Sequence, residues 1–124
     1  MSENKKVALI GWNPAVVDYS KWPDLTPEKL TAALEADKNK LNGLGYETEL
    51  MFIDDADTAY EVVKNSLAAG NYDCVLIGTG VRTVPEHFLV FESLVNAVHE
   101  SVPAVRICFN TNPSDTAEAV QRWI

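Results

Sequence analysis

The sequence predicts a single three-layer α/β/α domain, residues 1–124, built on a four-stranded parallel β-sheet. Short apolar runs alternate four times with segments that carry helical spacing, and this alternation is typical of parallel strands joined by right-handed crossovers. The length of 124 residues suits one domain, and 47% hydrophobic residues are enough for a real core. We expect the strand order 2-1-3-4, with helices on both faces.

Four runs are the predicted strands. Residues 7–12 and 72–78 are short apolar runs, and the second is apolar on both faces, as in a central strand. Residues 46–53 alternate with polar side chains at Glu47 and Glu49, which indicates an edge strand. Residues 104–109 form the fourth strand. Residues 1–6 are polar and are expected to fray.

Helices are expected between and after these strands. Thr26 can cap the first, Pro27 suits its first turn, and the helix runs to about Asn42. Gly43 and Gly45 end it. Further helices are expected at 57–69 and 85–100, and from a cap at Asn112 to Ile124, with a loop at 78–82.

Asp37 falls within the apolar stripe of the first helix, between Leu34 and Leu41. A buried carboxylate without a partner is costly. Either Asp37 reaches a hydrogen-bond donor, or this face of the helix is less buried than the pattern indicates. The sequence assigns no role to this residue.

The net charge of −8 argues against nucleic acid and anionic membranes as partners, because binding to polyanions requires positive charge. No apolar run approaches the roughly 20 residues of a membrane span. The N-terminus has no apolar signal segment. We therefore expect an acidic cytoplasmic protein. Cys74 and Cys108 each lie in an apolar run, with no Cys or His at metal-binding spacing, and are expected to be reduced core thiols.

Any ligand site is expected outside the carboxyl ends of the strands, where the strand order reverses. That crevice lies between the loops after the first and third strands. The first loop, residues 12–25, is longer than the roughly 2 to 6 residues usual for such loops. It carries Trp12, Asn13, Tyr19 and Trp22. Two interpretations stay open: a lid or stacking platform over a ligand, or aromatic anchors packed over the sheet edge.

The second loop reads Gly78, Thr79, Gly80, Val81, Arg82. Its glycines can bring backbone amides close to a ligand, and Arg82 offers donors suited to carboxylate or phosphate. The segment therefore fits an anion pocket. It also fits a tight strand-to-helix turn whose arginine pairs with a surface acid, since a lone Gly-x-Gly is weak evidence.

Two further segments border the crevice. Asn110 and Thr111 follow the fourth strand and offer neutral hydrogen bonds, or they belong to the cap of the last helix. Asp54 and Asp55 after the second strand carry the same ambiguity. His87 lies in the first turn of the third helix, where the helix dipole favours a neutral ring. It is the weak candidate for a catalytic acid or base, and otherwise a surface residue.

No specific catalytic or cofactor motif is present. The chain lacks a nucleophile elbow, a phosphate-binding P-loop and the glycines of a dinucleotide fingerprint, so no cofactor is indicated. Over its whole length the βα pattern resembles the flavodoxin-like group, which includes phosphoacceptor receiver domains. The receiver acids are missing: Gly11-Trp12 and Gly78-Thr79 stand in their places. The Ser/Thr-rich loop of a flavin-binding member is also absent.

Residues 78–82 and 106–111 look like those of a group of small bacterial proteins of unknown function. This resemblance implies no activity.

The helix at 85–100 has an apolar arc wider than one sheet contact needs. A homodimer through this helix, or packing against a neighbouring helix, would cover it. Two functions therefore stay open. One is binding or conversion of a small anionic metabolite, with Arg82 as anchor. The other is a non-catalytic dimeric interaction or regulatory module with a filled crevice.

Overall fold

The structure is a computed structural model that describes residues 4–124, without the side chains of residues 21 and 113. It contains one sheet of four parallel strands in the order β2-β1-β3-β4, which confirms the predicted order. The strands are β1 (Lys6–Trp12), β2 (Glu47–Ile53), β3 (Cys74–Ile77) and β4 (Arg106–Phe109). β2 lies at an edge and β3 in the interior, as their residue patterns predicted.

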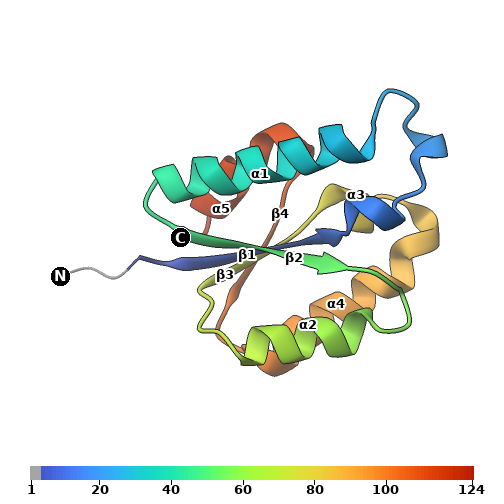
Figure 1. Cartoon of the computed structure of the whole chain (residues 1–124). Coiled ribbons are helices and arrows are strands. Elements are labelled where there is room, and N and C mark those ends of the chain that lie inside the picture. Colours follow the sequence, from blue (N-terminus) through green and yellow to red (C-terminus); the bar gives the residue numbers. More distant parts are fainter. Residues whose placement is uncertain (1–3) are drawn as a thin grey trace.

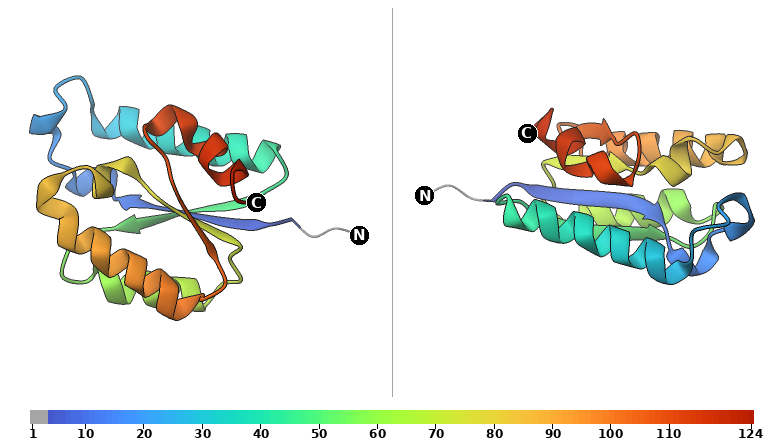
Figure 2. Two further views of the ribbon diagram at one scale, coloured as in Figure 1. Left: turned by 180° about the vertical axis from the view of Figure 1, so that it is seen from behind. Right: turned by 90° about the horizontal axis from the view of Figure 1, so that it is seen from above.

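Helices cover both faces of the sheet. α1 (Pro27–Gly43) and α5 (Thr116–Gln121) lie on one face, and α2 (Ala59–Ala68) and α4 (Phe88–Ser101) lie on the other (Figure 1). A four-residue helix, α3 (Thr79–Arg82), follows β3. The view from behind shows the same three layers, and the view from above looks onto α1 and α5 with the sheet beneath them (Figure 2).

Each face of the sheet has its own core. Ile10, Ile53 and Ile77 point towards α2 and α4 and belong to the larger cluster. Leu9 and Leu76 point towards α1 and α5 with a smaller cluster. The smaller cluster reflects loose packing of α1. Of the α1 residues, all of which the structure describes, Leu41 alone is buried.

The ends of α1 follow the predicted signals. The Thr26 hydroxyl accepts a hydrogen bond from the Lys29 amide at 3.1 Å. Beyond the helix, Gly45 has a φ of 101°, a left-handed conformation that side chains other than glycine rarely adopt. This turn leads the chain directly into β2.

Three segments differ from the expectations. Residues 79–82 form a helical turn and not a loop, because the Gly78 carbonyl accepts bonds from the Val81 and Arg82 amides. The helix expected at 85–100 begins as a 3-10 turn at 85–87. Lys6, expected to fray, is the first residue of β1 and donates its amide to Asp73, whereas residues 1–3 lie outside the described part.

None of the helices between residues 4 and 124 combines the length and apolarity needed to cross a bilayer.

Candidate functional site

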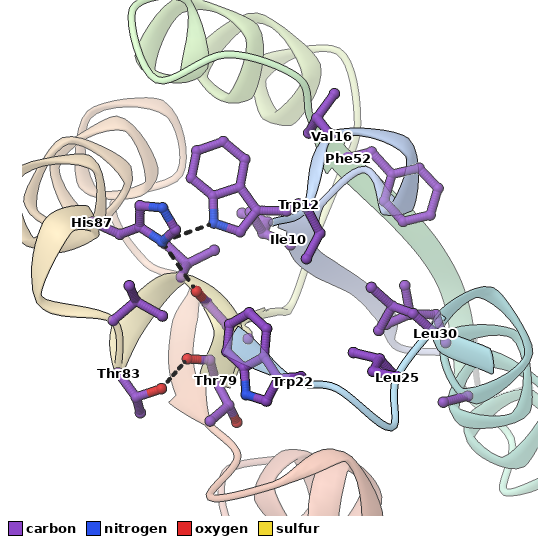
Figure 3. A pocket seen from close by; sticks show the side chains of 18 of the residues that line it. Ile10, Trp12, Val16, Trp22, Leu25, Leu30, Phe52, Thr79, Thr83 and His87 are labelled. Atoms are coloured by element: carbon purple, nitrogen blue, oxygen red, sulfur yellow. Dashed lines mark hydrogen bonds between the residues drawn. The ribbon is translucent and has the colours of Figure 1, made fainter. Parts of the chain in front are cut away.

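A cavity of about 1140 Å³ opens at the carboxyl ends of β1 and β3 and extends beneath α1. Its walls come from segments far apart in the sequence: the ends of β1 and β2, the loop 12–25, one face of α1, and α3 (Figure 3). The volume is slightly above the roughly 300–1,000 Å³ that is usual for small-molecule sites. The sequence-based location of the crevice therefore coincides with a hollow in the molecule.

The loop 12–25 covers one side of this cavity and does not fill it. It folds as two 3-10 turns, at 14–16 and 19–21. The Tyr19 hydroxyl donates to the Pro14 carbonyl at 2.5 Å, and the Asn13 side chain caps the first turn while donating to Asp54 at 2.9 Å. Trp22 lies on the cavity wall and is 36% exposed. The loop is thus an internally bonded cover that places Trp22 on the wall of the cavity.

Trp12 and His87 form a second part of the wall (Figure 3). The Trp12 indole Nε1 donates to His87 Nδ1 at 3.3 Å, and the two rings are 4.8 Å apart between centroids. His87 Nδ1 is also 3.3 Å from the Gly80 carbonyl. A single nitrogen cannot accept from Trp12 and donate to Gly80 at once, so the tautomer decides between the two contacts.

Several donors of the segment 78–82 are bonded within the protein, although the buried Nε of Arg82 has no hydrogen-bond partner among the described residues. The Thr79 amide donates to Asn110 Oδ1 at 3.1 Å, and the Val81 and Arg82 amides close the α3 turn on the Gly78 carbonyl. Arg82 donates to the Asn110 carbonyl, and its guanidinium lies 5.5 Å from the centre of the Phe109 ring. Arg82 is not among the cavity-lining residues. It is therefore not placed to anchor an anion there.

A chain of hydrogen bonds crosses the cavity wall from α3 to α1. The Thr79 hydroxyl donates to Asn110 Oδ1 at 2.8 Å, and Asn110 Nδ2 donates to the Thr116 hydroxyl at 3.1 Å. Thr116 in turn donates to Asp37 Oδ2 at 2.9 Å. All four residues line the cavity. Asn110 and Thr116 are buried, so the chain is a fixed part of the wall.

Asp37 is the residue of this wall that the sequence left without a role. It lines the cavity together with the apolar residues Leu30 and Leu34 of the same helix. Burial raises the pKa of the Asp37 carboxyl, while the bond from Thr116 and the charge of Lys40 lower it and the charge of Asp115 raises it further. The result is a carboxyl pKa above its ordinary value.

The charge of the wall is acidic. Besides Asp37, the lining includes the acidic residues Asp18, Asp24, Asp54, Asp55 and Glu86. No Lys or Arg lines it among the residues whose side chains the structure describes. Most of the remaining lining is apolar or aromatic. These properties favour a ligand with an apolar body and without negative charge.

The structure brings together six of the predicted ligand-binding residues on the cavity wall: Trp12, Trp22, Gly78, Thr79, Gly80 and Asn110. Three others, Asn13, Arg82 and Thr111, lie outside the lining. Thr111 donates its amide to Asp115 within the cap of the last helix, which is the capping interpretation. Asp37 also lines the cavity, although the sequence assigned it no role. The one unusual feature of Asp37 in the sequence was its acidic side chain within the apolar stripe of α1.

The two cysteines, far apart in sequence, meet in the core. Cys74 and Cys108 lie on the neighbouring strands β3 and β4, with their sulfur atoms 3.4 Å apart. Both are buried. The contact with Cys74 and the burial both raise the pKa of the Cys108 thiol. Within residues 4–124 no group of three or more His, Cys, Asp or Glu side chains is arranged to hold a metal ion.

The fold and the site define a four-stranded parallel α/β domain with an acidic, aromatic cavity at its strand ends. No family model matches the chain, and no curated protein sequence matches it.

Proposed function

We propose that this domain binds a small organic molecule in the cavity between the loops that follow β1 and β3. The observation that carries the proposal is the open volume of about 1140 Å³ under an internally bonded loop. An aromatic loop that only completed the core would fill the crevice. Here Trp12 and Trp22 line its walls, where an indole ring can stack on a ligand.

The geometry supports a different ligand charge from the anion expected on the basis of Arg82. That expectation depended on Arg82 and on the free amides of residues 78–80. Arg82 is bonded to Asn110 and lies over Phe109, and the Thr79 amide is bonded to Asn110. We therefore propose a ligand that is neutral or positively charged.

A matched pair of variants on α1 tests this function. Ala33 lines the cavity, whereas Ala32 is exposed on the same helix and does not line it. Ala33→Phe should fill the hollow and abolish the thermal stabilisation given by any small molecule that binds wild type. Ala32→Phe should leave that stabilisation intact. Ligand stabilisation that survives Ala33→Phe in a folded protein would place the site elsewhere.

A dimeric interaction module remains the second candidate, favoured by two exposed side chains at the start of α4. Phe88 is 60% exposed and Leu89 is 69% exposed. The rest of the arc is used within the chain, since Val90, Leu94 and Val98 are buried in the core. This leaves a smaller apolar surface for a partner than the sequence suggested. Light scattering at high protein concentration measures the oligomeric state.

A further inference from the structure

We infer that the cavity selects an organic cation, an ammonium or amidinium group on an aromatic or apolar body, and that Asp37 is its counter-ion. The inference rests on the proposed function, because it names the ligand class of the same cavity.

Asp37 is placed for this role by its helix. It lies on the side of α1 that faces the cavity, together with Leu30 and Leu34, because residues three or four apart share one face of a helix. A carboxylate at such a position loses hydration without leaving the reach of a ligand. A group that brings positive charge into the cavity would offset this loss, and an apolar group would not.

The hydrogen bonds of the wall fix which end of Asp37 is used. The amide group of Asn110 can only donate through Nδ2, so the Thr116 hydroxyl accepts there and directs its hydrogen to Asp37 Oδ2. Oδ2 is thereby held as an acceptor by one neutral donor. The other carboxylate oxygen, Oδ1, accepts no hydrogen bond from the residues that the structure describes.

The charges around Asp37 leave it incompletely balanced. Lys40, three residues along α1, attracts it, and Asp115 at the start of α5 repels it. The lining offers no described Lys or Arg side chain to compete for the carboxylate. A ligand ammonium would therefore find an acceptor, whereas a ligand carboxylate or phosphate would meet like charge.

The aromatic walls fit the same ligand class. Trp12 and Trp22 both line the cavity, and indole rings attract cations through their π faces more strongly than other side chains do. They also stack on flat apolar bodies. Carboxylate and indole together favour a cation over a neutral molecule of the same shape.

Three probes that share an indole body and differ in charge test the inference: tryptamine (cation), tryptophol (neutral) and indole-3-acetate (anion). Calorimetric titration of the full chain near pH 7 should give an affinity for tryptamine at least about tenfold above those of the other two. Asp37→Asn should remove about that tenfold preference and leave tryptophol binding within about twofold. Glu35→Gln, which removes one charge from the exposed side of α1, should change neither.

The outcomes separate the two proposals. If tryptophol or indole-3-acetate binds as well as tryptamine, and Ala33→Phe abolishes that binding, the cavity is a ligand site but the cation assignment is wrong. If Asp37→Asn leaves the preference for tryptamine unchanged, Asp37 is not the counter-ion. If none of the probes binds, or binding survives Ala33→Phe, the proposed function fails as well. Should Asp37→Asn not fold, the comparison of the three probes on wild type still decides the ligand charge.

Discussion

The Thr116 hydroxyl lies 2.9 Å from Oδ2 of Asp37 and donates to it, which links the start of α5 to the middle of α1. This bond answers the question that the sequence raised about a carboxylate in an apolar stripe. Asp37 has found a donor, and its helix face borders a cavity and not a closed core. The two alternatives that the sequence offered, a hydrogen-bond donor for Asp37 and a less buried helix face, are therefore both found.

Asp37→Asn should change the pH dependence of stability without removing the Thr116 bond, because the amide oxygen still accepts it. Burial raises the folded-state pKa of Asp37 above its unfolded value, so ionisation favours the unfolded chain. The variant should therefore gain stability relative to wild type as the pH rises through the Asp37 pKa. Because the site is partly solvated, the gain should stay below about 1 kcal/mol.

Urea unfolding of both proteins near pH 3.5 and pH 8 measures this difference. A relative stability of Asp37→Asn that falls between the two pH values would contradict the raised pKa.

Asn110→Ala should destabilise the protein by about 2–3 kcal/mol, because it leaves buried donors and acceptors without a partner. Asn110 joins Thr79 to Thr116 and is only 6% exposed. Asn96→Ala, on the exposed side of α4, should cost less than about 0.5 kcal/mol. Chemical unfolding curves give both values. Equal losses for the two variants would mean that the Asn110 chain does not stabilise the fold.

His87 should be found in the tautomer that carries its proton on Nε2, because only then can Nδ1 accept from the Trp12 indole. Long-range ¹H–¹⁵N spectra of the imidazole distinguish the two tautomers. His87→Phe should also move the Trp12 indole N–H resonance, whereas His99→Phe, on the exposed side of α4, should leave it in place. A proton on Nδ1 would instead assign the bond to the Gly80 carbonyl.

Both cysteine thiols should be protected in the folded protein. Cys74 and Cys108 are 0% and 1% exposed, and the raised pKa of Cys108 disfavours its thiolate. An aromatic disulfide reagent should react at least about a hundredfold more slowly with the native chain than with the unfolded chain. Rapid titration of one thiol in the native protein would show that this part of the core opens.

The architecture was predictable because its signals are local. Alternating strand and helix patterns gave the parallel sheet, and the apolar run at 74–77 marked the central strand. The crevice followed from the strand order alone. Even the cap of α1 at Thr26 was readable from its neighbours in the sequence.

Two contacts were not predictable: the hydrogen bond from the Arg82 side chain to Asn110 and the contact between the Cys74 and Cys108 sulfur atoms. Each depends on how distant segments pack against one another. Arg82 turns to Asn110, twenty-eight residues away, since α3 replaces the expected loop. The cysteines meet because β3 pairs with β4 in a particular register. Neither contact leaves a pattern in the sequence around the residue.

The most direct test of the ligand site is a ¹H–¹⁵N spectrum of the three tryptophan indoles during titration with tryptamine. Trp12 and Trp22 line the cavity, whereas Trp123 does not line it. The centre of the Trp123 ring lies 6.0 Å from the guanidinium carbon of Arg106. We predict saturable shifts of the Trp12 and Trp22 signals and a constant Trp123 signal. Constant Trp12 and Trp22 signals at saturating tryptamine, or equal shifts of all three, would contradict a ligand site in this cavity.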